Sequence, residues 1–245
     1  MLLEQPQSIR TVFFDAGFTL LHPNPSTAEI CQRICRQLDL HIDLDKLQER
    51  IPEADNFFYL QTRLKRHLWD SENTINAFWL EFYVNFLRPF VEEHDEPRLY
   101  QLARMISKEF EQHTSWQTYA DVLSTLDALK AKNYTLGIIS DWGIALGDIL
   151  HKLRLNQYFD SLVVSALVRH AKPSPSLYDL ALQRANAIAD YTLHVGDSYI
   201  SDVLGARSVG ITPILLDRHN KLQASHVDCI LIHSLTELLK VLEIE

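Results

Sequence analysis

Polar side chains that could bind a phosphate or a metal ion follow directly after several short apolar segments. Carboxylates can hold a hard divalent cation, while a lysine and a hydroxyl can bind an anionic phosphoryl group. One aspartate after a strand is weak evidence, because such residues commonly cap helices. Several in order along the chain predict a single functional site. The residues are Asp15, Ser140, Lys172, Asp197 and Asp202.

The apolar segments themselves predict the fold. TVFFDA, TLGIIS, SLVVSA, TLHVGD and TPILLD are rich in Val, Ile, Leu and Phe, as buried parallel strands are. Helical patterns alternate with them at residues 121–132, 145–155, 174–187 and 201–210. The alternation predicts an α/β protein with a Rossmann-like parallel sheet and helices on both faces. Because ligands bind at the carboxyl ends of strands in such sheets, the polar residues are expected at one edge.

A long glycine-free stretch separates the first predicted strand from the others. No glycine lies between Gly17 and Gly137, and glycine costs about 1 kcal/mol in a helix interior, so such a stretch favours helices. We expect an all-helical cap over residues 22–115, inserted into a core formed by residues 1–21 and 116–245. The connections are expected near 22–25 and 115–119.

Composition limits the class of protein. Hydrophobic residues make up 47% of the 245 residues, which is enough for a full apolar core. A net charge of −9 argues against a general nucleic-acid or anionic-membrane binder. No stretch approaches the roughly 20 apolar residues that span a bilayer, and the start MLLEQPQSIR lacks the pattern of a secretory signal. We expect a cytoplasmic monomer or homodimer without nucleic-acid or membrane partners.

Two of the three cysteines, Cys31 and Cys35, lie four residues apart on an expected helix. The spacing could suit a metal pair, but no further cysteine or histidine completes a zinc pattern. We therefore expect two buried thiols.

The order of these motifs resembles the haloacid dehalogenase-like (HAD) hydrolase superfamily, in the branch whose helical cap is inserted between the first and second motifs. Four segments carry the resemblance: DAGFT at 15–19, SD at 140–141, Lys172, and LHVGDSYISDVLGARSVG at 193–210. The fourth segment is particularly specific. With the cap, these motifs cover essentially the whole chain.

The resemblance implies a role for each matching residue. Asp15 corresponds to the nucleophile that forms an aspartyl-phosphate, and Lys172 to the lysine that orients it and neutralises charge. Thr19 and Ser140 correspond to hydroxyl positions that bind phosphate. The implied Mg²⁺ ligands are Asp15, the backbone carbonyl of Gly17, Asp197 and Asp202, the last as a ligand or an orienting residue. The implied reaction is Mg²⁺-dependent hydrolysis of a small phosphorylated metabolite, which needs mainly positioning and electrostatic stabilisation.

The sequence departs from the family pattern at Gly17. Phosphatases of the family carry a second aspartate there as general acid and base, a contribution typically worth ~10²–10⁴-fold in rate. Haloacid dehalogenases and phosphonatases have a non-acidic residue at this position, so either is an alternative. A further alternative is a catalytically degenerate member that binds a phosphorylated ligand or a protein.

Other residues carry weaker expectations. Arg63, Arg66 and His67 could share a helix face and contact an anionic substrate, although a solvated basic face is the ordinary explanation. His22 could approach the site from a loop. We expect Asp141 to cap the helix that follows it.

Overall fold

The computed structural model describes residues 3, 5–65, 67–222 and 227–244. Its strands are β1 (Thr11–Phe14), β2 (Leu21–Pro23), β3 (Trp116–Thr118), β4 (Thr135–Ser140), β5 (Ser161–Val164), β6 (Thr192–Gly196), β7 (Thr212–Leu216) and β8 (Ile230–Ile232). Its α-helices are α1 (Thr27–Gln37), α2 (Leu44–Leu64), α3 (Glu72–Leu87), α4 (Glu96–Glu109), α5 (Val122–Ala131), α6 (Leu146–Lys152), α7 (Ser165–Val168), α8 (Pro175–Ala185), α9 (Gly205–Arg207) and α10 (Leu235–Val241).

Within the described residues, six parallel strands form one sheet in the order β5-β4-β1-β6-β7-β8. The first strand is central: β4 pairs with one side of it and β6 with the other. After β1 the chain first forms β4 and β5 on one side, and then β6, β7 and β8 on the other side. This switch point is the place where open α/β sheets bind ligands. The predicted α/β fold with a Rossmann-like parallel sheet is confirmed.

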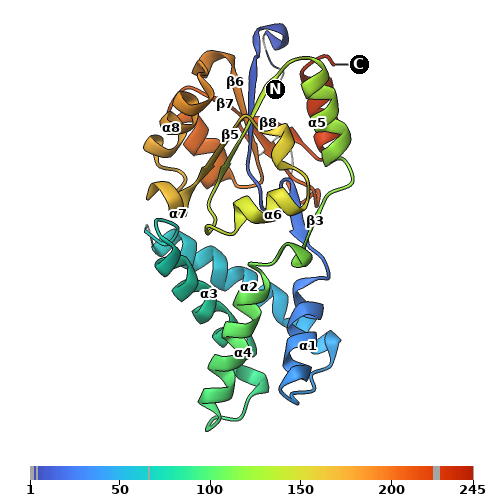
Figure 1. The fold of residues 1–245 in the computed structure, drawn as a ribbon, viewed down its shortest axis with the longest axis vertical. Coiled ribbons are helices and arrows are strands. Elements are labelled where there is room, and N and C mark those ends of the chain that lie inside the picture. The colour runs from blue at the N-terminus through green and yellow to red at the C-terminus, as the bar shows by residue number, and fades with distance from the viewer. Residues whose placement is uncertain (1–2, 4, 66, 223–226, 245) are drawn as a thin grey trace.

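Alternating side chains of β1 pack on opposite faces of the sheet, as the period of a strand requires. Val12 and Phe14 join an apolar cluster with helices α5, α6 and α10. Phe13 faces the other way and packs against α8 and α9. Figure 1 shows α8 and α5 on opposite sides of the sheet. Both faces are thus covered, which explains why the strands read as continuous apolar runs.

Helices α1–α4 follow one another between β2 and β3 and lie together at one end of the molecule (Figure 1). They enclose an apolar cluster of their own, in which Ile30, Phe78 and Leu102 are buried. The first helix starts with a capping box, since the Ser26 hydroxyl accepts from Glu29 N and the Glu29 carboxylate accepts from Ser26 N.

The two segments that connect these helices to the sheet are paired with each other. Strands β2 and β3 form a two-stranded antiparallel ribbon, with His22 opposite Gln117 and Pro23 opposite Trp116. The sequence predicted connections at these places but not their pairing, because segments of three residues carry too little pattern.

One predicted helix has a different form. Residues 201–210 were expected to be α-helical, but Tyr199–Leu204 form a π-helical turn and only Gly205–Arg207 continue as an α-turn. The wider turn brings Asp202 inward, where it is 1% exposed. Such π-turns occur frequently at functional sites.

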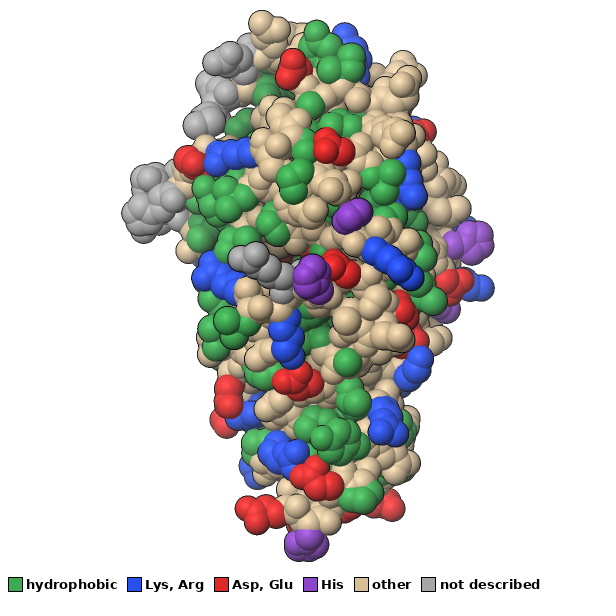
Figure 2. Space-filling view, turned by 90° about the vertical axis from the view of Figure 1, so that its left-hand side faces the viewer, with side chains coloured by type: hydrophobic (Ala, Val, Ile, Leu, Met, Phe, Trp, Pro, Cys, Tyr) green, Lys and Arg blue, Asp and Glu red, His purple; other side chains and the backbone are tan. Residues whose placement is uncertain are grey.

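The surface in Figure 2 carries acidic and basic side chains interspersed with hydrophobic ones, without a continuous basic area among the described residues on that face. None of the described helices combines the length and apolar character that a bilayer span requires.

Candidate active site

Asp15 lies directly after β1, at the switch point of the sheet. Its backbone N–H donates to Val195 O at 2.9 Å, which fixes the turn against β6. One carboxylate oxygen, Oδ1, accepts from Lys172 Nζ at 2.5 Å and from Ser140 Oγ at 3.2 Å. Two other predicted residues, from distant parts of the chain, therefore converge on one oxygen atom of Asp15.

Asp202 completes this arrangement from the π-turn after β6. Its Oδ1 accepts from Lys172 Nζ at 2.7 Å and from His194 Nε2 at 2.9 Å, and its Oδ2 accepts from Ser198 N at 3.0 Å. A β-carbon on Gly196 would lie 2.1 Å from Asp202 Cγ, so only glycine permits this approach. Both carboxylate oxygens are thus engaged by the protein itself.

Burial and charge set the protonation of these groups. Burial alone would lower the pKa of Lys172, but the carboxylates of Asp15 and Asp202 outweigh it and hold the pKa well above its usual value. Burial raises the pKa of Asp15 more than the Lys172 ammonium lowers it. Burial also lowers the pKa of His194, so its neutral ring donates from Nε2 to Asp202. The lysine is the cationic centre of the site.

Asp141 does not cap a helix, and that prediction is wrong. Helix α6 begins only at Leu146, and Asp141 Oδ1 instead accepts from Lys172 N at 3.0 Å. Burial raises the pKa of Asp141 to about 7. The carboxylate ties the loop that carries Lys172 to the end of β4, a contact across 31 residues that no local pattern could reveal.

Thr19 is fully buried, and its hydroxyl has no hydrogen-bond partner within the part of the chain that the structure describes. Its carbonyl accepts from Arg218 at 2.7 Å and 3.2 Å. Arg218 also binds the Asp121 carboxylate with both terminal nitrogens at 3.1 Å and lies 3.8 Å from the Tyr119 ring centre. Arg218 was missed in the sequence because it follows a strand as one basic residue among many.

Two aromatic residues beside the nucleophile were also missed. A β-carbon on Gly17 would lie 3.1 Å from Trp142 Cζ3, so the tryptophan ring covers this glycine. Phe18 has a φ of 55° and is 51% exposed at the same loop. The position of Trp142, two residues after Ser140, was the sequence signal that could have placed its aromatic ring near the site.

The residues suit a hard cation by donor type. Asp15 and Asp197 place carboxylates just after the ends of neighbouring strands, and Gly17, with its backbone carbonyl, lies two residues after Asp15. The site also has four carboxylates, counting Asp141 and Asp202, against the single ammonium of Lys172. Among the described residues no group of three or more His, Cys, Asp or Glu side chains is arranged to hold a metal ion. Mg²⁺ commonly uses only one or two carboxylates with water and substrate phosphate, so the donor set fits it.

Other predicted residues lie apart from this cluster. The Arg63 guanidinium stacks over Tyr59 at 4.1 Å, and His67 pairs with Asp70 at 2.6 Å. Arg66 lies outside the described residues. His22 stands on β2 and stacks on Tyr119, with ring centres 4.6 Å apart. Both Cys31 and Cys35 are free and buried, as expected.

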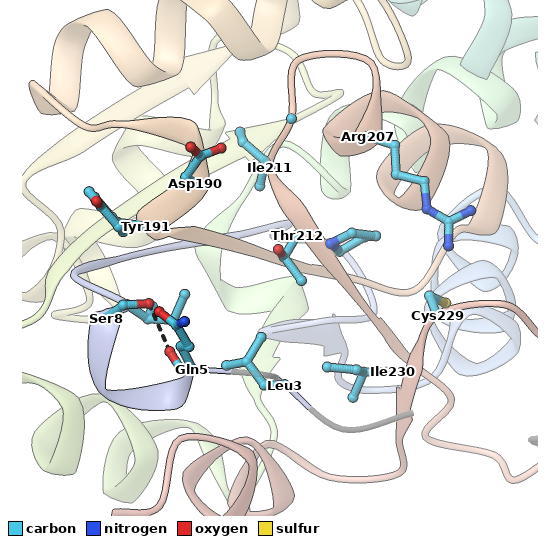
Figure 3. A pocket seen from close by; sticks show the side chains of 13 residues that line it. Leu3, Gln5, Ser8, Asp190, Tyr191, Arg207, Ile211, Thr212, Cys229 and Ile230 are labelled. Carbon is cyan, nitrogen blue, oxygen red and sulfur yellow. Dashed lines mark hydrogen bonds between the residues drawn. The ribbon is translucent and has the colours of Figure 1, made fainter.

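A cavity of about 810 Å³ is distant from this chemistry. It opens at the amino-terminal ends of β6–β8, where Figure 3 shows Asp190, Arg207 and Thr212 around it. Arg207 already binds the Asp228 carboxylate at 2.9 Å, and Ser8 Oγ donates to Gln5 O. We assign the active site to the opposite, carboxyl edge, where the buried charged groups gather.

Comparison with known proteins agrees with this geometry. The family described as haloacid dehalogenase-like hydrolase matches residues 12–216. The chain belongs to this family. Haloacid dehalogenase-like hydrolase domain-containing protein 3 of Danio rerio is 29% identical over 221 residues, covering 90% of this chain and 89% of that protein. The glyceraldehyde 3-phosphate phosphatase of Methanothermobacter thermautotrophicus is 30% identical over 149 residues, covering 60% of this chain and 65% of that protein.

A solved structure extends the likeness to the whole fold. The HAD-hydrolase YfnB of Bacillus subtilis superposes with a TM-score of 0.76, covering 96% of this chain and 99% of that chain at 18% identity. At that identity the likeness concerns the fold alone. The chain is therefore a HAD-like hydrolase by family and by architecture.

Proposed function

We propose that this HAD-like hydrolase is a Mg²⁺-dependent phosphatase of a small phosphorylated metabolite, with Asp15 as the nucleophile. One observation carries the proposal: a buried lysine bridges Asp15 to Asp202 while the Ser140 hydroxyl contacts the same Asp15 oxygen. A carboxylate held in this way has one oxygen fixed by the protein, and its other oxygen can attack a substrate. The phosphatase activity of the archaeal relative supports the same reaction class.

The reaction divides into two steps at Asp15. A free carboxylate oxygen attacks phosphorus, the bond from phosphorus to the leaving oxygen breaks, and the leaving group departs with the bonding electron pair. Water then attacks the aspartyl-phosphate, releases inorganic phosphate and restores the carboxylate. The Lys172 ammonium and the Ser140 hydroxyl offset the negative charge of the transferring group, an electrostatic effect that is usually the largest in such catalysis.

A magnesium ion would be held by Asp15, the carbonyl of Gly17 and Asp197. When bound, it would neutralise charge on the phosphoryl oxygens. We assign Asp202 a positioning role, because both of its oxygens are already engaged by Lys172, His194 and Ser198 N. Its carboxylate holds the lysine towards Asp15.

The glycine at position 17 restricts the leaving group. No side chain there can protonate a departing oxygen, so alkoxide leaving groups should depart slowly. Phosphate esters whose leaving group is stable as an anion need no such proton. We therefore expect activity on esters with acidic leaving groups and an unusually long-lived aspartyl-phosphate.

Residues 22–115 form a separate cap in this proposal. The support is that α1–α4 have their own apolar cluster and are joined to the sheet by the paired β2–β3 ribbon. Closure of the cap over the carboxyl ends of the strands would exclude water from the site.

A screen of phosphorylated compounds with Mg²⁺ tests the proposal, read both as phosphate release and as a trapped covalent adduct. We expect release from p-nitrophenyl phosphate and a phosphate label on Asp15. Asp15→Asn should abolish both, while Asp190→Asn at the opposite edge should change neither. A folded protein that forms no adduct with any compound would contradict the proposal.

A 2-haloacid dehalogenase is the second candidate, favoured by the absence of an acidic side chain at Gly17. The same carboxylate would then displace a halide from carbon. Halide release from 2-chloropropionate, without metal, would identify that reaction.

A further inference from the structure

The Trp142 ring lies close to the space that a side chain at position 17 would enter. A β-carbon on Gly17 would lie 3.1 Å from Cζ3 and 3.9 Å from Cε3 of the ring. The backbone of Gly17 does not lie in the left-handed region, so the conformation of the loop does not require glycine there. The ring would have to shift by a few tenths of an ångström to admit a β-carbon there.

The backbone of Trp142 is held by hydrogen bonds, and its ring packs against another aromatic side chain. Trp142 N donates to Ser165 Oγ at 3.2 Å, and Ala166 N donates to Trp142 O at 3.4 Å. Trp116 packs edge-on against the ring, with centres 4.6 Å apart. Trp116 in turn contacts Phe110, which stacks on Tyr83 of α3. A row of aromatic side chains thus runs from the helical end of the molecule to Gly17.

The geometry of phosphoryl transfer decides what this ring can touch. The attacking and leaving oxygens lie roughly in line through phosphorus. The leaving group therefore lies on the side of the phosphoryl group away from Asp15. The family resemblance implies that the residue at position 17 faces the leaving oxygen, so a ring that covers Gly17 would lie beside the leaving group.

We propose that Trp142 is a specificity-determining residue that stacks against a planar, aromatic leaving group. The inference rests on the proposed phosphatase function and narrows its substrate to the class of aryl phosphates. Two independent features agree on that class: a planar group stacks on the indole, and an aryloxide leaves without the proton that Gly17 cannot supply. In the first step the aryl C–O bond stays intact, the P–O bond breaks, and the aryloxide keeps the electron pair.

Binding of two phosphonates tests the stacking separately from turnover. Phenylphosphonate and methylphosphonate differ in the planar group, and neither has an ester oxygen to lose. Calorimetry with Mg²⁺ present should show the wild-type protein binding phenylphosphonate about five- to tenfold more tightly than methylphosphonate, as expected for one aromatic contact.

Three variants make the test specific. Trp142→Leu should reduce the phenyl-to-methyl affinity ratio to about 1, and Trp142→Phe should keep most of it, because a second aromatic ring can stack. Tyr191→Leu, an aromatic change at the opposite edge of the sheet, should leave the ratio at the wild-type value. Circular dichroism checks that each variant is folded.

The outcomes separate this inference from the proposed function. A wild-type ratio near 1, or a ratio that survives Trp142→Leu, overturns the role of Trp142. If that happens while acetyl phosphate still labels Asp15, the phosphatase proposal stands alone. If acetyl phosphate labels nothing and neither phosphonate binds, both proposals fail.

Discussion

At the scale of single residues, the Lys172 ammonium lies between two carboxylates in the protein interior. Its side chain is 2% exposed and contacts Asp15 and Asp202. Removing one partner of a buried ion pair leaves uncompensated charge and typically costs about 3–5 kcal/mol. We expect Lys172→Met to lower the free energy of unfolding by that amount in urea denaturation. The same change at Lys130, whose ion pair with Asp160 is half exposed, should cost less than about 1 kcal/mol.

The Trp142 ring packs close to Gly17, and this contact limits the activity that the family's aspartate could restore at position 17. A β-carbon at Gly17 forces the ring of Trp142 to move by a few tenths of an ångström. We therefore expect Gly17→Asp alone to gain little activity. The double variant Gly17→Asp with Trp142→Ala has room for the carboxyl group and should hydrolyse an alkyl phosphate up to about 10²-fold faster than either single variant.

The measurement is the steady-state turnover of glycerol phosphate by four proteins: the wild type, Gly17→Asp, Trp142→Ala and the double variant. Together they give the interaction between the two substitutions. Circular dichroism must first show that each variant is folded. A double variant no faster than Trp142→Ala would mean that the site does not use an acid at position 17.

The identity of the residues near the nucleophile could be predicted more fully than their contacts. Asp15, Ser140 and Lys172 follow apolar segments, so their positions after parallel strands predict that they lie at one edge of the sheet. Asp141 and Trp142 follow the same strand, but their side chains turn towards Lys172 N and Gly17, respectively. The directions of these two side chains depend on contacts between loops that are far apart in the chain. A local sequence pattern does not reveal such contacts.

At the scale of secondary-structure elements, one carboxylate links the start of α3 to the loop after β4. Glu72, the first residue of α3, accepts from Ile144 N at 2.9 Å, just after Trp142 in the chain. Hydrogen bonds to charged groups contribute about 1.5–3 kcal/mol. We expect Glu72→Ala to speed hydrogen exchange at the Ile144 amide by at least about tenfold.

Glu81→Ala serves as the matched control, because Glu81 lies on the same helix and its carboxylate pairs with Lys65 at the surface. It should leave exchange at Ile144 unchanged. Equal protection of Ile144 in wild type and Glu72→Ala would show that this contact does not hold the helix to the loop.

Element prediction succeeded where the pattern was long and failed where it was short. The four central strands, β4, β1, β6 and β7, are largely buried, and the edge strand β5 shares their apolar composition, so composition alone marks all five. The edge strand Ile230–Ile232 and the ribbon strands have three residues each, and their pairing partners decide their structure. The π-turn at Tyr199–Leu204 reads as an ordinary helix because its apolar spacing is similar.

At the scale of the whole molecule, an excess of negative charge is concentrated at one edge of the sheet. The chain carries a net charge of −9, and four of its carboxylates surround a single ammonium at the carboxyl ends of β1, β4 and β6. Like charges held together destabilise the folded state. A divalent cation that binds there should therefore stabilise the entire protein, whether or not a substrate is present.

Thermal unfolding with and without Mg²⁺ measures this stabilisation directly. At a magnesium concentration about 100 times Kd, a ligand that binds only the folded state adds about 2.7 kcal/mol, which corresponds to a Tm increase of roughly 5–10 °C for a chain of this size. Asp197→Asn should remove most of the increase, because it removes one of the two carboxylate ligands. Asp190→Asn, an equal change of charge at the opposite edge, should retain it. Equal magnesium-dependent increases in both variants would place the cation elsewhere, and the hydrolase would then need a different account of how it neutralises a bound phosphate.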